Sequence, residues 1–152
     1  MSPHIRVSAS AVVVNDGRLL LVKFDDESGI HYNLPGGGAD PGESAADCCV
    51  REVLEETSAL VTVGRLLLVR EYEPVRCRNS FGRKHKLNLI FACDLVSGST
   101  VEMPRTPDAD QIGVEWVELE RLTEINLVSP TLARQILDSL AVMTTLYVME
   151  SC

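Results

Sequence analysis

The chain has 152 residues, a hydrophobic content of 45% and a formal net charge of −8 at pH 7. This length suits one domain with a sizeable core, and the composition excludes disordered and fibrous classes. The acidic balance argues against wholesale electrostatic binding to nucleic acid or to an anionic membrane. The N-terminus lacks a basic flank followed by an apolar run, and no uncharged apolar stretch reaches a membrane span of about eighteen residues, so we expect a soluble, cytoplasmic protein.

The cysteines support the same expectation. They are odd in number and include no CxxC pair, which suits neither a disulfide framework nor a zinc site. We therefore expect reduced and mostly buried thiols in a cytoplasm. The five residues are Cys48, Cys49, Cys77, Cys93 and Cys152.

The first predicted elements form a hairpin. β-rich runs at residues 5–14 and 18–24 flank an Asn-Asp-Gly turn, and Asp-Gly between such runs is a strong hairpin signal. A loop then leads to a leucine, a proline and three consecutive glycines, and a helix is predicted at about 43–57. Strands are predicted near 60–72 and 86–96, with a basic loop between them.

The C-terminal third is predicted to contain a long loop, a short strand with the sequence VEWVEL, and a helix. Ser129 stands where an N-cap belongs, and Pro130 takes the first helical position. The apolar residues of this helix keep helical spacing, which favours a core-facing stripe over a partner-binding surface. These residues are Leu132, Ile136, Leu140 and Met143. Strands interleaved with two helices predict one α/β domain with a mixed sheet over residues 1–152.

The helix predicted at 43–57 gathers negative charge, because Glu52, Glu55 and Glu56 fall on one of its faces. Like charges at this spacing cost about a few tenths of a kcal/mol per pair, so a cation should compensate them. A solvated helix face is the simplest explanation. However, the glycines at 36–38 allow a ligand close to the backbone, and an oxygen-rich pocket beside them would suit Mg²⁺ shared with substrate phosphates.

Residues 37–59 resemble the Nudix box, G-x5-E-x7-R-E-U-x-E-E-x-G-U, in which U is aliphatic. Six of the seven fixed identities agree, at Gly37, Glu43, Arg51, Glu52, Glu55 and Glu56. Ser58 replaces the family glycine, and Ala59 replaces a bulkier aliphatic residue. Glycine would suit a left-handed residue that ends the helix, so we expect the serine to cost on the order of 1 kcal/mol.

The resemblance implies a Nudix-like α/β/α sandwich with a mixed β-sheet. It also implies hydrolysis of the diphosphate linkage in a nucleoside diphosphate linked to another moiety, X, with Mg²⁺ or Mn²⁺ as cofactor. The implied metal ligands are Glu52, Glu55, Glu56 and the backbone carbonyl of Gly37. Arg51 and Glu43 resemble the supporting ion pair of the family, which would orient the glutamates.

The general base is left open by the resemblance, since the family uses either a box glutamate or a carboxylate from a later loop. Glu52 is the first candidate. The later loop supplies Asp108, Asp110 and Glu115. Among these we prefer Asp110 as a metal ligand or base, although a solvated aspartate is an equal alternative.

Substrate recognition must come from outside the box. The stretch from Arg76 to Lys86 carries five cations and no acid, namely Arg76, Arg78, Arg83, Lys84 and Lys86. These cations could receive phosphates, and Phe81 or Tyr72 could stack on a base. A mobile basic loop kept soluble by its charges is an equal alternative. Tyr32 and Arg6 are further candidates for lining the pocket.

Several substrates and two other functions stay open. ADP-ribose, a nucleoside triphosphate or a nucleotide sugar would each fit, and Pro74 resembles a proline of the ADP-ribose-cleaving branch. The basic loop keeps an RNA 5′-end pyrophosphohydrolase open, against which the net charge argues. A catalytically silent nucleotide sensor would normally show eroded box glutamates. A homodimer is also left open, because many relatives pair while no segment of this chain announces an interface.

Overall fold

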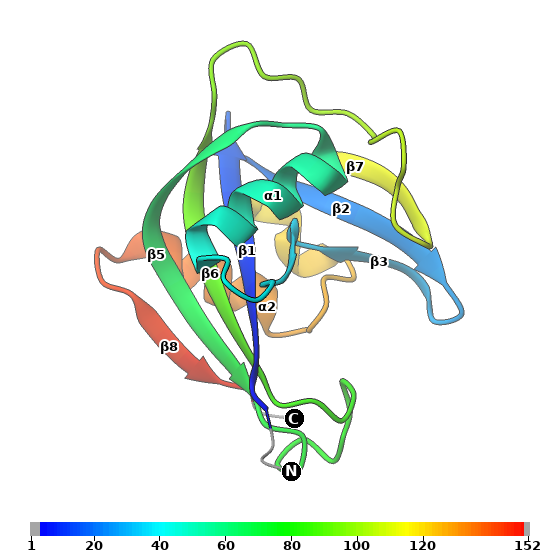
Figure 1. The fold of residues 1–152 in the computed structure, drawn as a ribbon, viewed down its shortest axis with the longest axis vertical. Helices are drawn as coiled ribbons and strands as arrows, with labels where there is room; N and C mark the ends of the chain where they lie inside the picture. The colour runs from blue at the N-terminus through cyan, green and yellow to red at the C-terminus, as the bar shows by residue number, and fades with distance from the viewer. Residues whose placement is uncertain (1–3, 151–152) are drawn as a thin grey trace.

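The computed structural model describes residues 4–150, which form a mixed β-sheet with helices on both sides (Figure 1). In chain order the elements are β1 (Arg6–Asn15), β2 (Arg18–Asp26), β3 (Gly29–Asn33), β4 (Gly36–Gly38), α1 (Ala45–Thr57), β5 (Val61–Tyr72), β6 (Lys86–Leu95), β7 (Gln111–Glu118), the 3-10 helix η1 (Leu119–Glu124), α2 (Leu132–Ala141) and β8 (Leu146–Met149).

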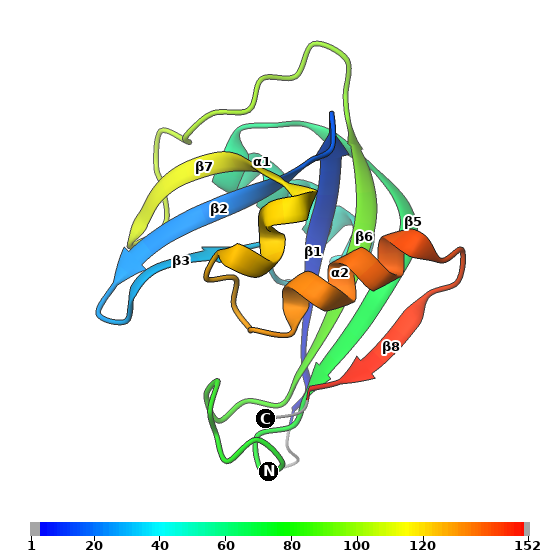
Figure 2. The same ribbon diagram turned by 180° about the vertical axis from the view of Figure 1, so that it is seen from behind.

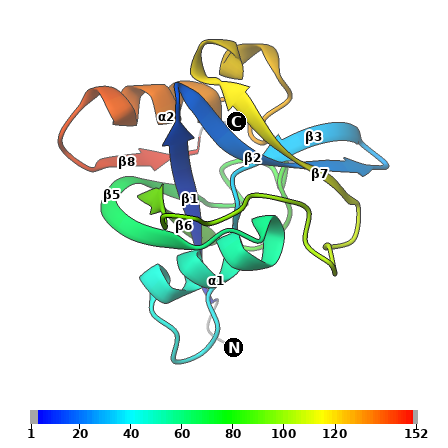
Figure 3. The ribbon, with the colours of Figure 1, turned by 90° about the horizontal axis from the view of Figure 1, so that it is seen from above.

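Strand β1 organises the sheet. It pairs in parallel with β6 and antiparallel with β4, in the register Ala9 opposite Gly37. β5 continues the sheet antiparallel to β6, and β8 adds to β5 in parallel. β2 pairs with both β3 and β7. Seen from above, α1 and α2 lie on opposite sides of the sheet (Figure 3). The predicted α/β class with a mixed sheet between helices is therefore confirmed.

The predicted hairpin is present but short. β1 and β2 pair only at Val14 opposite Leu19 and Asn15 opposite Arg18, around a turn in which Gly17 has a φ of 71°. Beyond the turn the strands diverge, because most of β1 pairs with β6 and β4 instead. The local signal thus located the turn, while pairing with distant strands decided the rest.

Alternate residues of β1 face two separate cores, as expected for a strand buried on both sides. Ala9, Ala11 and Val13 belong to a buried cluster that includes Cys49 and Val53 of α1. Val12 points the other way and packs in a cluster that includes Ile136 of α2. β1 therefore contributes residues to both hydrophobic cores and separates the core under α1 from the core under α2.

Helix α2 begins later than predicted. Its N-cap is Thr131, without a side-chain cap hydrogen bond, so the expected cap at Ser129 is wrong. The Ser129 hydroxyl instead donates to Glu150 Oε1 at 2.8 Å. Leu132 and Ile136 are in the core as predicted. The remaining members of the predicted stripe are not: Leu140 is 36% exposed, and Met143 is 87% exposed beyond the end of the helix.

The cysteines follow the expectation in part. Cys48, Cys49 and Cys93 are free and buried. Cys77 is disulfide-bonded, so the expectation of a reduced thiol is wrong there. Cys152 lies outside the described residues. Within residues 4–150, no helix has the length and apolar character needed to span a membrane.

Candidate active site

Helix α1 carries the acidic residues and is capped at both ends. The Ser44 hydroxyl accepts a hydrogen bond from the Asp47 N–H at 3.0 Å, which fixes the start of the helix. Ser58 ends it with a φ of 61°, and its N–H donates to the Leu54 carbonyl at 3.0 Å. The serine thus adopts the left-handed conformation that favours glycine.

The glycine strand β4 lies directly against this helix. A Cβ added at Gly37 would come within 2.5 Å of the Glu52 carboxyl group. A Cβ added at Gly36 would come within 2.2 Å of the Ser10 hydroxyl on β1. The glycines are therefore required because α1 and β1 both approach the backbone of β4 too closely for a side chain.

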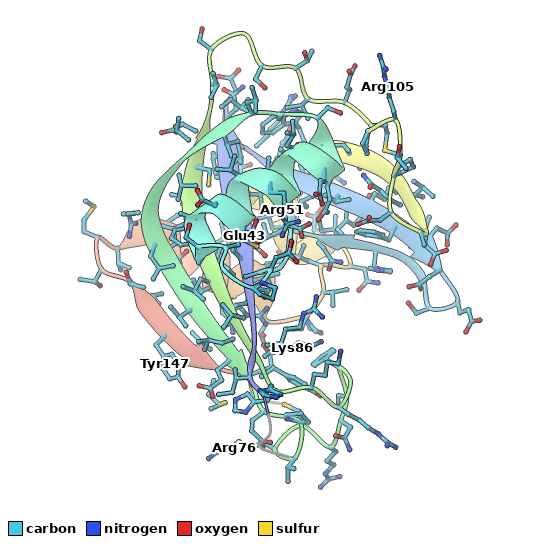
Figure 4. All side chains as sticks on the ribbon, in the orientation of Figure 1. Glu43, Arg51, Arg76, Lys86, Arg105 and Tyr147 are labelled. Carbon is cyan, nitrogen blue, oxygen red and sulfur yellow. The ribbon has the colours of Figure 1, made fainter. Side chains whose placement is uncertain are left out.

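Arg51 clamps the start of the helix to this strand. Its Nε donates to Glu43 Oε1 at 2.7 Å and its Nη2 to Glu43 Oε2 at 3.0 Å, which is a bidentate pair. Nη1 donates to Glu52 Oε1 at 2.9 Å, and Nη2 also reaches the Gly38 carbonyl at 3.1 Å. The guanidinium lowers the pKa of Glu43 to about 2. Figure 4 shows Arg51 and Glu43 together beside α1.

The glutamates differ sharply in exposure. Glu56 is only 4% exposed, and its Oε1 accepts a hydrogen bond from the Gly36 N–H at 3.2 Å. Burial raises its pKa to about 8, and the charge of Glu52 adds to this rise. Burial also raises the pKa of Glu52. Leu54, an apolar residue of the same helix, is 44% exposed. The helix therefore buries a carboxyl group at the site while it leaves a leucine in solvent.

The donor chemistry at this site fits a hard divalent cation. Glu52, Glu55 and Glu56 present carboxylate oxygens from one helix, and the Gly37 carbonyl lies beside them, where Cys48 Sγ donates to it at 3.4 Å. The charge of Arg51 is shared with Glu43 and Glu52, so a buried Glu56 carboxylate would gain most from an added cation. As the side chains stand, no three His, Cys, Asp or Glu residues in the described range 4–150 already surround a metal position.

The three carboxylates of the later loop and strand have different surroundings. The charge of Asp108 raises the pKa of both Glu52 and Glu56, and Asp108 lines a hollow together with Glu55. Asp110, the preferred candidate from sequence, has a φ of 67° and lines a different hollow, formed with Asp26, Glu27 and Ser28. Glu115 accepts hydrogen bonds from Lys23 at 3.0 Å and from Tyr32 at 3.1 Å. Of these three carboxylates, Asp108 is therefore the one whose charge influences Glu52 and Glu56.

A cleft runs from the glycine strand toward the opposite end of the sheet. It consists of two hollows that share Ser8, Arg70, Lys86, Asn88 and Val128. One hollow also reaches Gly36 and Gly37, and the other also reaches Tyr72 and Phe81.

Only part of the predicted substrate set lies in this cleft. Lys86, Tyr72 and Phe81 line it, whereas Arg76, Arg78, Arg83 and Lys84 are not among its lining residues. Figure 4 shows Arg76 at the far end of the molecule from Arg51. The Arg6 guanidinium lies beside Gly38, and Tyr32 lines a hollow with Glu115 and Trp116.

Sequence reasoning missed Ser8, Ser10, Asn88 and Arg70 as lining residues of the cleft. The signal that could have found them is a polar residue at every second position of a strand whose neighbouring positions are apolar.

Comparisons with known proteins bear on the family and the fold of this chain. A family model described as NUDIX domain matches residues 4–138. The mouse protein "Nucleoside diphosphate-linked moiety X motif 6" is 28% identical over 132 residues, which cover 86% of this chain and 40% of that protein. The "ADP-ribose pyrophosphatase" of Methanocaldococcus jannaschii is 29% identical over 124 residues, which cover 80% of this chain and 67% of that protein. A solved NUDIX hydrolase from Nitrosomonas europaea superimposes with a TM-score of 0.75 at 25% identity, covering 91% of this chain and 90% of that chain.

Proposed function

The chain belongs to the NUDIX domain family, and we propose that it is a metal-dependent pyrophosphohydrolase that cleaves the diphosphate linkage in a nucleoside diphosphate linked to another moiety, X. The observation that carries this proposal is the buried Glu56 carboxyl group held against the glycine strand beside Glu52. Such a group is costly to ionise unless a cation compensates it.

Glu52, Glu55 and Glu56, with the Gly37 carbonyl, would hold Mg²⁺ or Mn²⁺. A divalent ion held there would supply charge neutralisation to the diphosphate and make an attacking water more acidic. Arg51 orients Glu52 through a hydrogen bond of 2.9 Å, and Glu43 fixes Arg51 from the other side. This pair positions the ligands and is not required to touch the substrate.

Glu52 remains our first candidate for the general base. It lies against Gly37, where an added Cβ would come within 2.5 Å of its carboxyl group, so it is close to the proposed metal site and the attacking water. For the alternative base from the later loop, the position of Asp108 now favours it over Asp110.

For the substrate we propose a class of compounds and no single member of it. The names of the relatives include ADP-ribose and nucleoside diphosphate-linked moieties, and both agree with an NDP-X substrate; nucleoside triphosphates and nucleotide sugars stay alternatives. RNA is less favoured, because four of the five basic side chains, Arg76, Arg78, Arg83 and Lys84, do not line the cleft. A silent sensor is disfavoured because all the box glutamates are present. One domain over residues 1–152, a cytoplasmic location and a homodimer stay predictions.

The test is hydrolysis of a panel of NDP-X compounds, nucleoside triphosphates and capped RNA, with and without Mg²⁺. We expect Mg²⁺-dependent release of a nucleoside monophosphate from at least one NDP-X compound. Glu55→Gln and Glu56→Gln should each abolish it, while Glu120→Gln, an exposed control in η1, should not. Nucleotide binding without turnover of any compound would instead favour the sensor.

A further inference from the structure

The sheet face that looks toward α2 changes character along its strands. Near α2 this face is apolar, with Val12 of β1, Leu68 of β5 and Ile90 of β6 in one buried cluster. Moving two residues along each strand reaches the same face again. The residues found there are Ser10, then Ser8, on β1, Arg70 on β5 and Asn88 on β6. Polar side chains on the same sheet face as the buried apolar cluster indicate that this part of the face contacts something other than a hydrophobic core.

The helix that covers the apolar part stops short of the polar part. α2 starts at Leu132, and Figure 2 shows it crossing the middle of β5 and β6 while the ends of these strands continue beyond it. The polar positions Ser8, Arg70 and Asn88 line the cleft described above. The strands therefore supply a polar floor at the place where no helix covers them.

The Asn88 side chain is oriented by its neighbours on this floor. Its Oδ1 accepts hydrogen bonds from the Ser8 and Ser10 hydroxyls, both at 3.2 Å. Among residues 4–150, no protein acceptor takes a hydrogen bond from its Nδ2. A side-chain amide carries two such donor protons. Asn88 is thus a fixed amide whose donor side is left for a ligand, and it lines both hollows of the cleft.

The two cations of the cleft, Arg70 and Lys86, both make contacts within the protein, and the buried Nε of Arg70 is left without a hydrogen-bond partner in the described part of the chain. The Arg70 Nη2 pairs with Glu150, which is only 7% exposed, and also donates to the Ser129 hydroxyl at 2.8 Å. Lys86 Nζ donates to the Phe81 carbonyl at 3.1 Å and lies 5.6 Å from the centre of the Tyr72 ring. Hydroxyl and amide groups therefore make up the floor, which suits a neutral hydrogen-bonding group better than a phosphate.

Two aromatic residues, Tyr72 and Phe81, line the end of the cleft away from the glycine strand, and they differ in exposure. Tyr72 is 7% exposed, its hydroxyl donates to the Gly82 carbonyl at 2.6 Å, and it accepts from the Phe81 N–H at 3.0 Å. These bonds hold Phe81 edge-on to Tyr72, with ring centroids 5.8 Å apart. Phe81 remains 36% exposed. Tyr72 is therefore the anchor, and Phe81 is the ring that a planar ligand could contact.

We propose, building on the proposed hydrolase function, that this cleft binds the nucleoside half of the substrate and that Asn88 is a specificity-determining residue. The diphosphate lies at the Gly36–Gly37 end, beside the box glutamates. The Asn88 amide donates to an oxygen of the sugar or base, and the base contacts Phe81. From the Gly36–Gly37 end through Asn88 to Phe81, the cleft thus offers sites for a charged diphosphate, a neutral hydroxyl-bearing sugar and a planar base, in the order in which a nucleotide carries them.

Two substitutions at Asn88 test the hydrogen bond. Asn88→Asp keeps an acceptor for both serine hydroxyls and removes the donor, while Asn88→Ala removes both. We expect each to raise KM for the NDP-X substrate about 10-fold, with kcat within about 2-fold of the wild type. Asn126→Ala, an exposed control of the same residue type, should leave KM unchanged. Circular dichroism melting checks that each variant is folded.

Binding without turnover separates this inference from the proposed function. The four nucleoside 5′-monophosphates are titrated by calorimetry in the absence of metal, and inorganic pyrophosphate is titrated in the presence of Mg²⁺. We expect at least one monophosphate to bind, Asn88→Asp and Phe81→Ala to weaken it about 10-fold, and pyrophosphate to be indifferent to both changes. Such a result in a protein that hydrolyses nothing would support the cleft assignment and reject the hydrolase. Hydrolysis with unchanged KM in both variants, or no binding of any monophosphate, would overturn the cleft assignment.

Discussion

Gly36 and Glu56 are joined by a hydrogen bond of 3.2 Å from the backbone N–H to the carboxyl oxygen, across the contact between β4 and α1. This bond holds a buried acidic group beside the first residue of β4. Because the pKa of Glu56 is raised to about 8 by burial, its ionisation works against folding unless a cation is bound.

The first prediction concerns pH in the metal-free protein. A pKa raised from the unfolded value of about 4.3 to about 8 gives a stability contribution that is complete at low pH and declines as the pH rises to 8. Relative to Glu56→Gln, the wild type should lose up to a few kcal/mol between about pH 5 and 8. Urea unfolding at several pH values measures this difference. Saturating Mg²⁺ should abolish most of it, and parallel pH profiles for the two proteins would contradict the burial argument.

The second prediction concerns the close approach at Gly37. Gly37→Ala places a methyl group within 2.5 Å of the Glu52 carboxyl group, so Glu52 must move. We expect at least an approximately 10-fold loss of kcat/KM, since misplaced ligands lose metal affinity or activity to about this extent. Gly113→Ala is the control, because its nearest neighbour would be 3.5 Å away. Equal activities of the two variants would show that the position of Glu52 is not critical.

The third prediction separates the two loop aspartates. Asp108→Asn should lower kcat about 10-fold or more if this carboxylate assists the box. Asp110→Asn should stay within about 2-fold of the wild type, because Asp110 lines a different hollow. Steady-state kinetics at saturating substrate distinguishes them. The reverse order of effects would restore Asp110, the candidate that the sequence favoured.

The fourth prediction concerns the two ends of α1. Ser58→Gly should stabilise the protein by about 0.5–1 kcal/mol, because Ser58 has a φ of 61° that glycine adopts without strain. Ser44→Ala should have the opposite effect, about 1 kcal/mol of destabilisation, because it removes the side-chain cap on Asp47. Chemical denaturation measures both free energies of unfolding. A destabilising Ser58→Gly would mean that the serine hydroxyl makes a favourable interaction of its own.

The fifth prediction concerns the ion pair behind Glu52. Arg51→Lys keeps the charge but loses the bidentate contact with Glu43, so kcat should fall about 10- to 100-fold. Arg121→Lys serves as a control, because Arg121 and its partner Glu124 are both more than half exposed. Wild-type kinetics in Arg51→Lys would show that charge alone orients the glutamates.

The box, the hairpin turn and the central helix could be predicted from sequence because their signals are local. The resemblance to the Nudix box implied the ion pair between Glu43 and Arg51, which the structure shows as a bidentate contact, and Asp-Gly indicated the β1–β2 turn. The burial of Glu56 in place of Leu54 could not be predicted, since it depends on β4 packing against one side of α1. The difference between Asp108 and Asp110 also required the path of the loop in three dimensions.

The cleft was missed for a related reason. The strand predictions for β5 and β6 were correct within a residue or two, yet they did not show which strands would be neighbours. Ser8 and Asn88 become partners only because β1 and β6 pair in parallel in that register. Pairing of residues so distant along the chain carries no local signature.

The alternation along β1 has a consequence for how proteins of this kind can diverge. Its odd-numbered positions, Ala9, Ala11 and Val13, support the helix that carries the acidic box, whereas the even-numbered Ser8 and Ser10 belong to the cleft. Exchanges at Ser8 can therefore change ligand preference without altering the residues that pack against α1, whereas Ser10 also packs against Gly36 of β4. Insertion of a single residue into β1 would move every following side chain to the opposite face of the sheet. We therefore expect this strand to diverge by point substitution and to keep its length.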